Sequence, residues 1–349
     1  MNALARMYRG ETKWDFVGLS KRTLIVSLTL VAASILVMII KPFNLSIDFT
    51  GGVLVSVENT SDASVEEIRG ELRGIGYADA RVQITGEGFV IVQTEALDAA
   101  EMDTLVVAVT DVAGADVNDA NVSAVGPTFG AEVTRKAIQA LVVFLIVIAL
   151  FITWRFEWKM AVAALAALFH DLIITGGLYA LVGFIMTPAT IIAVLTILGY
   201  SLYDTVVVFD KVTENVHEHH DRSTFSGIVN LSMNQVLMRS INTSLTSLLP
   251  VGSLLLVGFL ALGAETLKEF ALALFIGIAV GTYSSIFVAA PILSRWKESE
   301  PEWERQRRRA GKGEMQPAAV SEVVQPEAPA VAPTSSAAPK PPKQRRKRR

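Results

Sequence analysis

The sequence predicts a polytopic α-helical membrane protein with six transmembrane helices and one extracytoplasmic α+β domain between the first two of them. The 349 residues are 51% apolar and have a mean hydropathy of +0.44, values that exclude an ordinary soluble domain. Six apolar runs are long enough to cross roughly 30 Å of hydrocarbon as helices. The segment after the first run is too long for a connector and has strand and helix periodicities of its own.

We expect the transmembrane helices at residues 23–40, 137–154, 160–185, 189–209, 241–262 and 270–293. The first run could be mistaken for a secretory signal. However, residues 1–22 form a flank before it, it has full bilayer length, and Lys41-Pro42 ends it without a convincing cleavage site. We therefore expect a retained anchor. The sequence has no cysteine, which excludes disulfides and thiol chemistry.

Charge asymmetry predicts the orientation of the chain. Residues 42–134 contain 16 acidic residues and three arginines, whereas residues 301–349 contain 12 basic residues and five glutamates. Further basic residues lie between the spans on the same side as the termini, namely Arg155, Lys159, Lys211, Arg222 and Arg239, whereas the opposite turns offer only Lys268. Because basic residues are retained on the cytoplasmic side, we expect a multi-pass protein of the cytoplasmic (inner) membrane with both termini in the cytoplasm.

The long loop, residues 41–136, predicts a small folded domain. Its expected elements are a strand at 53–58, a helix at 65–75, strands at 81–85 and 89–94, a helix at 97–112 and a strand at 120–125. Gly86-Glu87-Gly88 between the two middle strands is typical of a hairpin. The order βαββαβ predicts a ferredoxin-like domain, an antiparallel sheet with two helices on one face.

Residues 296–349 predict a cytoplasmic, disordered tail rich in proline and alanine, since they lack the apolar surface for a core. The tail ends in a basic cluster of Arg345, Arg346, Lys347, Arg348 and Arg349. This cluster could bind anionic lipid headgroups or ribosomal RNA, or it could be a solvated end that follows the positive-inside rule.

Polar groups at membrane depth are the candidate functional residues, because placing them in lipid is costly. In the fourth span Ser201, Asp204 and Thr205 lie on one half of a helix, about one turn inside the cytoplasmic edge. Asp204 has a one-carbon stem and cannot easily reach water. A carboxyl group placed there suits the binding and release of protons. The alternative is a buried aspartate that bonds a neighbouring helix.

A polar stripe marks the start of the fifth span. Its members recur at spacings of three and four residues: Gln235, Arg239, Asn242, Thr243, Thr246 and Pro250. Such a stripe must face protein or a water-filled path. Arg239 and Asp204 enter from the same side at similar depth and could pair, so that a proton on Asp204 would release Arg239. A static ion pair between two helices is the alternative.

Two further features lie inside the membrane. His170 and Asp171, near the middle of the third span, are adjacent and therefore point about 100° apart, one toward the interior and the other toward a neighbouring helix. A proton relay and a structural contact are both open there. In the sixth span Gly277, Gly281 and Ser284 share one face, which predicts close helix packing. We expect no metal site and no organic cofactor.

Several motifs then carry a resemblance to a known family. They are Ile47-Asp48-Phe49-Thr50-Gly51-Gly52, Val125-Gly126-Pro127 with Gly130-Ala131-Glu132, Gly199 through Asp210, Asn234-Gln235 through Arg239 to Leu245-Thr246, and Phe270-Ala271-Leu272 with Gly281-Thr282-Tyr283-Ser284-Ser285. In this order they resemble the motifs of SecF-type members of the SecD/SecF family, over about residues 12–295. Leu202-Tyr203 departs from the pattern, because relatives often carry a more polar residue beside the aspartate.

The resemblance implies a bacterial subunit, related to resistance-nodulation-division transporters, that joins SecD as an obligate partner in a twelve-span unit. It implies that protons are the coupling ion, and that the outer domains draw an unfolded preprotein from SecYEG after SecA has pushed it. The expected proton path contains Asp204, Arg239, Thr205, Gln235, Asn242, Thr246, Asp171 and His170. The motif Asp48, Phe49, Thr50, Gly51 and Gly52 would couple the outer domain to the first span, with the glycines allowing a sharp turn.

Three other functions were weighed. A proton-coupled small-molecule or lipid exporter of the same superfamily is disfavoured, because six spans and one outer domain form half of such a pump. An intramembrane aspartyl protease is disfavoured, because Asp171 and Asp204 differ by about 9 Å in depth and Arg239 would be a strange neighbour for a carboxyl dyad. A structural assembly factor is the third alternative, and it predicts that changing Asp204 leaves export normal.

Overall fold

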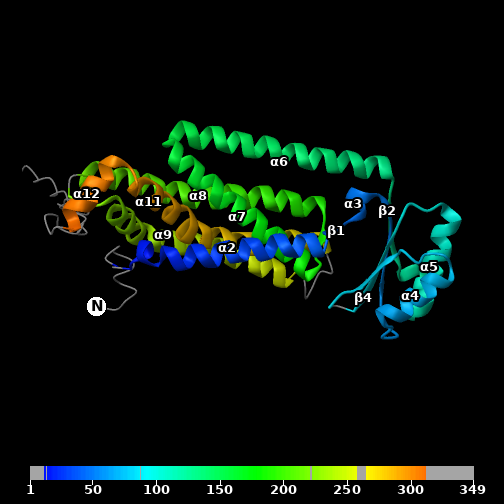
Figure 1. Cartoon of the computed structure of the whole chain (residues 1–349). Coiled ribbons are helices and arrows are strands. Elements are labelled where there is room, and N and C mark those ends of the chain that lie inside the picture. The colour runs from blue at the N-terminus through cyan, green and yellow to red at the C-terminus, as the bar shows by residue number, and fades with distance from the viewer. Residues whose placement is uncertain (1–11, 13, 87, 221, 258–264, 312–349) are drawn as a thin grey trace, which may run out of the picture. The chain divides into compact units, whose positions relative to one another are not determined.

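The computed structural model describes residue 12 and residues 14–86, 88–220, 222–257 and 265–311 (Figure 1). Six helical runs in these ranges are long and apolar enough to cross a membrane. They are α2 (Phe16–Ile40), α6 (Pro127–Arg155), α7 (Trp158–Val182), α8 (Pro188–His219), α9 (Phe225–Val257) and the run Leu267–Glu298. The last run covers all but the first two residues of α10 (Glu265–Ser284), a π-helical turn η3 (Ser285–Ala289) and α11 (Ala290–Glu298). The prediction of a polytopic helical membrane protein is confirmed.

The helices continue beyond the apolar runs that the sequence marks. The helix α9 begins at Phe225 rather than near Ile241, because its first turns pack against the end of α8. There the side-chain amide of Asn215 donates to Ser232 Oγ (2.7 Å) and to Gln235 Oε1 (2.8 Å). Hydropathy cannot find a helical extension that is held by hydrogen bonds to protein.

Small residues set the packing of the inner helices. A Cβ atom on Gly177 would lie 2.3 Å from Cβ of Ser34 in α2. One on Gly277 would lie 2.2 Å from Cδ1 of Ile197 in α8, and one on Gly281 would lie 2.9 Å from Cβ of Ser201. Helix α7 can therefore approach α2 closely, and α10 can approach α8. In contrast, α6 runs apart from the other helices in Figure 1 and buries few side chains.

The segment between α2 and α6 folds into a four-stranded sheet with two helices. Its elements are β2 (Gly52–Glu58), α4 (Val65–Gly74), β3 (Arg81–Ile84), β4 (Phe89–Thr94), α5 (Ala99–Ala113), the 3₁₀ turn η1 (Val117–Asp119) and β5 (Asn121–Val125). The strand order is β3-β4-β2-β5 and every pairing is antiparallel. Alternate residues Val53, Val55 and Val57 are buried in a core with α4 and α5, which lie on the same side of the sheet in Figure 1.

Each helix of this domain starts at a reciprocal cap. Ser64 accepts a hydrogen bond from the Glu67 amide, and the Glu67 carboxylate accepts from the Ser64 amide and hydroxyl (2.7 and 2.8 Å). These bonds hold the pKa of Glu67 below its ordinary value. Asp98 and Glu101 form the same capping box at α5. The start of each of these helices is therefore set by two residues only three positions apart in the sequence.

The start of the expected tail is ordered. Residues 296–311 were predicted to be disordered with the rest of the tail, but α11 continues to Glu298 and α12 spans Pro301–Gly311. Trp303 explains the difference: it is 2% exposed and its ring packs 5.0 Å from that of Phe225 and 4.8 Å from that of His220. The remainder of the tail, with Arg345, Arg346, Lys347, Arg348 and Arg349, lies outside the described residues.

Candidate functional site

Asp204 is buried among the inner helices. It lies on α8 with 6% of its surface exposed, and its Oδ1 accepts a hydrogen bond from Ser240 Oγ of α9 (2.7 Å). Its other oxygen, Oδ2, is buried without a hydrogen-bond partner among the described residues. The adjacent Thr205 donates from Oγ1 to Ser285 Oγ in η3 (3.1 Å). Asp204 thus lies where α8, α9 and η3 meet, with spare capacity to bind a proton.

Arg239 does not pair with Asp204 in this structure. Its guanidinium is exposed and Nη2 donates to the Tyr203 hydroxyl at 3.0 Å, and no ion pair joins these two described residues. The predicted pair fails to form because Asp204 points inward to Ser240, while Tyr203, 52% exposed, and Arg239 lie on the outer side of the same helix pair. The side chains of adjacent residues on a helix diverge by about 100°, so Tyr203 leads outward from α8 while Asp204 leads inward, and Arg239 bonds to the tyrosine.

The other members of the fifth-span stripe lie apart from Asp204. Gln235 accepts from Asn215 of α8, which places it in the hydrogen-bonded contact between α8 and α9. Thr246 is exposed and donates to the backbone carbonyl of Asn242 (2.9 Å), and Asn242 is half-buried. The stripe therefore contains residues that hold two helices together as well as residues that face outward.

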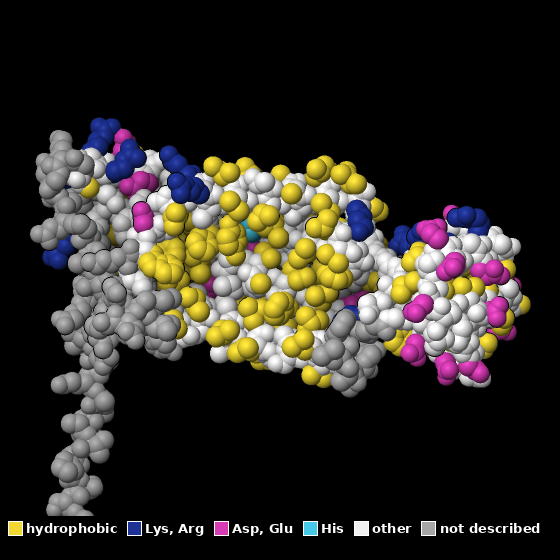
Figure 2. Space-filling model, turned by 90° about the horizontal axis from the view of Figure 1, so that it is seen from below, with side chains coloured by type: hydrophobic (Ala, Val, Ile, Leu, Met, Phe, Trp, Pro, Cys, Tyr) yellow, Lys and Arg dark blue, Asp and Glu magenta, His cyan; other side chains and the backbone are white. Residues whose placement is uncertain are grey.

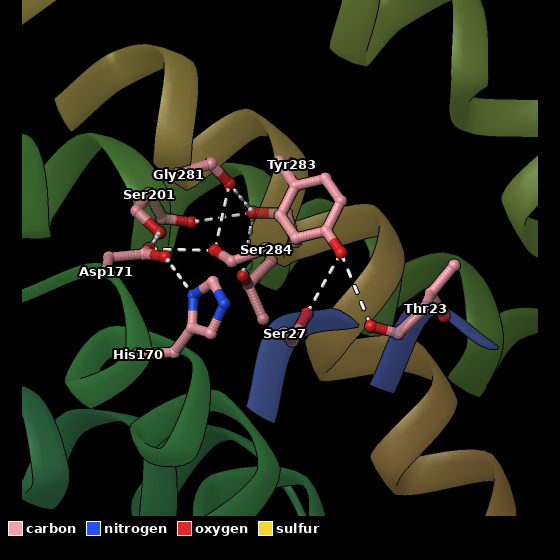
Figure 3. Close-up of polar contacts among 10 residues, drawn as sticks. Thr23, Ser27, His170, Asp171, Ser201, Gly281, Tyr283 and Ser284 are labelled. Carbon is pink, nitrogen blue, oxygen red and sulfur yellow. Dashed lines mark hydrogen bonds and ion pairs between the residues drawn. The ribbon is translucent and has the colours of Figure 1, made fainter. Parts of the chain in front are cut away.

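His170 and Asp171 form a deeply buried polar cluster, 5% and 1% exposed (Figure 3). Although adjacent residues on a helix diverge by about 100°, the two side chains meet at their ends, with Nδ1 of His170 3.0 Å from Oδ1 of Asp171. The other oxygen, Oδ2, accepts from Ser201 Oγ of α8 (2.6 Å) and from Ser284 Oγ of α10 (2.8 Å). Three helices therefore meet at one carboxylate.

Adjacent serine side chains on α10 and η3 lie beside the two aspartates. Ser284 serves Asp171, while the next residue, Ser285, accepts from Thr205 beside Asp204. Ser285 also donates to the carbonyls of Gly281 (2.9 Å) and Ser201 (3.3 Å). The π-helical turn begins at Ser285, and such turns are frequent at functional sites. Ser284, expected to serve helix packing, is thus also a hydrogen-bond donor to Asp171.

Sequence reasoning missed Ser240 and Ser285. Both are polar residues inside apolar helices, and Ser240 follows Arg239 directly, so a search for small hydroxyls near the candidate aspartates could have found them. Serine is a weak signal because its hydroxyl can bond to its own helix. Only the three-dimensional structure shows whether such a hydroxyl bonds to its own helix or to a neighbouring one.

The motif after the first span makes a tight connection. Ser46 caps the short helix α3 (Ile47–Thr50) and donates from Oγ to Asp48 Oδ2 (2.8 Å). Gly51 and Gly52 then have φ angles of 74° and 122°, in the region that favours glycine. A Cβ atom on Gly51 would lie 2.7 Å from Cα of Pro127, and one on Gly52 would lie 2.1 Å from the carbonyl oxygen of Thr94. The predicted sharp turn is confirmed.

This motif also contacts a second pair of membrane helices. The strand β1 (Asn44–Leu45) pairs in parallel with β6 (Ile185–Met186), which connects α7 to α8. The Ser46 amide donates to the Met186 carbonyl (2.9 Å). On the sheet side, Gln93 of β4 donates to the carbonyl of Leu45 (3.2 Å). Residues 44–46 therefore bond both to the sheet and to the connection between the helices that carry Asp171 and Asp204.

The surface differs between the two parts of the chain. Figure 2 shows apolar side chains spread over the transmembrane helices and acidic side chains gathered on the sheet domain. Within the helical surface Tyr203 and Arg239 are exposed, together with Thr246. An arginine and a threonine on an apolar surface need a polar partner.

The sequence of this chain is similar to those of known membrane proteins. The family described as "Protein export membrane protein SecD/SecF, C-terminal" matches residues 105–299, and the "SecD/SecF GG Motif" matches residues 36–58. The chain is 38% identical to the protein translocase subunit SecF of Streptomyces coelicolor, over 91% of this chain and 88% of that protein. It is 44% identical to the subunit SecF of Mycobacterium tuberculosis, over 84% and 70% of the two chains.

The chain is also similar to longer proteins. It is 37% identical to the protein translocase subunit SecDF of Thermus thermophilus, over 83% of this chain and 40% of that protein. A crystal structure of SecDF from Thermus thermophilus superposes with a TM-score of 0.75 and 36% identity, over 83% of this chain and 39% of that chain. The chain therefore spans about two fifths of the length of these SecDF proteins.

Proposed function

The chain belongs to the SecF branch of the SecD/SecF family of protein-export membrane proteins, and from that premise we propose how it works. It is a subunit of the Sec protein-export machinery and a multi-pass membrane protein. With SecD it uses the proton motive force to promote late steps of preprotein translocation through SecYEG, after SecA-driven insertion. The relatives in which SecD and SecF form one chain support SecD as the partner.

The observation that carries the proposal is a buried carboxyl group behind an exposed polar face. Asp204 is held by one serine hydroxyl, with one oxygen unpaired among the described residues. Arg239 and Tyr203 lie outside it, bonded to each other and exposed. A guanidinium on a transmembrane surface is costly against lipid. SecD would cover this face and complete a path for protons between the two chains.

Protons are the coupling ion in this proposal, and each predicted residue has a place in it. Asp204 binds and releases the proton. Arg239 interacts with the charged groups that SecD would place opposite it. Thr205 lies on α8, and Asn242 and Thr246 lie on α9. Gln235 keeps α8 and α9 together by accepting a hydrogen bond from Asn215. His170 and Asp171 form a second polar centre on the inner side.

The outer domain is proposed to be ferredoxin-like and to hold the emerging unfolded preprotein. The strand order β3-β4-β2-β5, with two helices on one face, supports this class. Both termini are proposed to lie in the cytoplasm, in agreement with the acidic loop and the basic flanks. The basic end of the tail, Arg345 to Arg349, is proposed to contact anionic lipids or the ribosome.

A proton-coupled exporter of small molecules or lipids is not favoured, because the relatives that match over most of this chain are protein translocase subunits. The same names indicate a transport subunit rather than an enzyme.

The proposal is tested by secretion of a reporter protein in cells with and without a collapsed proton gradient. The chain carries Asp204→Asn or Arg239→Ala, and its amount in the membrane is measured in parallel. We expect each variant to secrete at the rate that the unaltered protein shows after the gradient is collapsed, since the proton site is lost. The matched control is Asp210→Asn on the same helix, whose carboxylate makes an exposed ion pair with Arg155 (2.7 Å) of small energetic value. Normal, gradient-dependent secretion by the Asp204 and Arg239 variants would refute the mechanism.

A further inference from the structure

The His170–Asp171 cluster has properties that neither helix packing nor the Asp204 site explains. His170 is on α7 with 5% of its surface exposed, and its Nε2 atom is buried without a hydrogen-bond partner among the described residues. An imidazole that only holds helices together would be expected to use both nitrogens. One nitrogen of this buried ring is therefore free to bind a proton.

Asp171 is built to remain ionised. Its Oδ2 accepts from Ser201 and Ser284 (2.6 and 2.8 Å), and its Oδ1 lies 3.0 Å from Nδ1 of His170. Hydrogen bonds to the charged form of a carboxylate stabilise that form. An ionised carboxylate can only accept, so the hydrogen between the two residues belongs to Nδ1. The neutral ring then has its lone pair at Nε2.

We propose that His170 and Asp171 form a second proton-binding site, in which Nε2 of His170 takes up the proton and Asp171 stays ionised. A proton from solvent adds to the Nε2 lone pair, while the Nδ1 hydrogen remains donated to Asp171. The net charge of the pair changes from −1 to zero, and release is the reverse step. This inference deepens the proposed function and rests on it for the role of the site in a proton-driven cycle.

The groups around the His170 ring can stabilise the positive charge that the ring carries after it takes up a proton. The Tyr283 ring of α10 stacks on His170, with centroids 6.1 Å apart and an angle of 26° between the planes. An aromatic face at about 6 Å stabilises a cation. Burial also favours the neutral pair over a lone buried carboxylate. Both effects support proton uptake without requiring an external anion.

The groups that face the pair come from three elements. Helix α8 contributes Ser201, and α10 contributes Tyr283 and Ser284. The hydroxyl of Tyr283 lies 3.0 Å from Ser27 Oγ of α2 and donates to the carbonyl of Thr23 (3.4 Å) (Figure 3). None of these facing groups is a charged residue. The nearby carboxyl group is that of Asp204, whose neighbour Thr205 donates to Ser285. The charge of the pair is thus set inside the chain, next to the first span.

The test is a nitrogen NMR titration of the full-length chain in lipid bilayers, with ¹⁵N-labelled histidine, over roughly pH 5 to 9. The His170 signals are assigned by their loss in His170→Gln, and His217→Gln on the exposed face of α8 serves as the matched control. We expect a neutral ring with hydrogen on Nδ1 at high pH and a doubly protonated ring at low pH. In Asp171→Asn the ratio of protonated to neutral ring at a fixed pH should fall about tenfold or more.

The inference is overturned if the ring of the unaltered chain carries its hydrogen on Nε2, or if it shows one state over the whole range. These results are read from the unaltered chain, and the His170→Gln variant serves only to assign the signals. Asp204→Asn is titrated alongside and should leave the His170 signals in the two expected states. If His170 does not titrate while Asp204→Asn still abolishes gradient-dependent secretion, this inference alone fails. If His170 titrates while Asp204→Asn secretes normally, the proposed function fails.

Discussion

At the scale of single residues, hydroxyl donors decide how the two buried aspartates are held. Asp171 receives hydrogen bonds from two serines and is close to a histidine nitrogen, whereas Asp204 receives one from Ser240. The number of donors determines how well a carboxylate is stabilised away from water. The two carboxylates are therefore held differently: Asp171 has three polar neighbours, and Asp204 has one hydroxyl donor and a second oxygen without a partner among the described residues.

Single glycines decide whether the sheet can reach the membrane helices. The φ angle of Gly52 is 122°, and an added Cβ would meet the backbone oxygen of Thr94. Gly126, at the other end of the same domain, has an extended conformation and open space around an added Cβ. Gly52 and Gly126 both lie where the sheet domain joins the membrane helices. They differ in backbone conformation and in what an added Cβ would contact.

We predict that Gly52→Ala lowers the local stability of the sheet by about 2–4 kcal/mol. Alanine disfavours the positive φ angle at this position, and its Cβ would clash with the carbonyl oxygen of Thr94. Hydrogen exchange of the full-length chain measures this as faster exchange of the β2 and β4 amides, by about tenfold or more. Gly126→Ala should change these rates little. Equal exchange rates in the two variants would show that the turn does not require glycine.

The candidate site could be predicted from the sequence only in part. Asp204, Arg239, His170 and Asp171 could be found because ionisable groups are rare at membrane depth. Their partners could not, since helical spacing places Asp204 and Arg239 at similar depth without indicating the direction of either side chain. The structure directs Asp204 to Ser240 and Arg239 to Tyr203.

At the scale of elements, the connection between the outer sheet and the membrane helices includes two short strands. The strand β1 follows α2, and β6 lies between α7 and α8. Asn44 is the Cα partner of Ile185, and Leu45 is the partner of Met186. A movement of α7 and α8 would therefore reach the sheet through β1 as well as through α2.

An engineered cysteine pair tests this connection, because the chain has no cysteine of its own. We predict that Asn44→Cys with Ile185→Cys forms a disulfide readily in the membrane, as paired strand positions lie within the Cα separation of about 4.4–6.8 Å that a disulfide requires. The measurement is a mobility shift after protease cleavage between the two sites. Leu54→Cys with Ile185→Cys is the control and should remain reduced. A control pair that cross-links equally well would contradict the strand pairing.

Long elements were predictable and short ones were not. The strand at Phe89–Thr94 and the helix at Val65–Gly74 have the periodicities that the sequence indicates. The strands β1 and β6 contain two residues each, too few for any alternation. The π-helical turn at Ser285–Ala289 leaves no pattern in an apolar run, and α12 depends on the burial of Trp303.

At the scale of the whole molecule, the chain presents a polar face that its own helices leave uncovered. Arg239, Tyr203 and Thr246 are exposed along α8 and α9, beside apolar surface suited to lipid (Figure 2). A second set of spans would remove the cost of this face and place new groups opposite Asp204. This surface agrees with the proposal that SecD is the partner, which the SecDF relatives support.

Proton flux into lipid vesicles is the most direct measurement of this account. The chain is reconstituted with SecD, and also alone, and a pH-sensitive dye inside the vesicles reports protons that enter under an imposed gradient. We predict flux only when both chains are present, and a loss of about tenfold or more in Asp204→Asn, with Asp210→Asn unchanged. Equal flux through the chain alone, or through the Asp204→Asn complex, would contradict the claim that the two chains form one proton path.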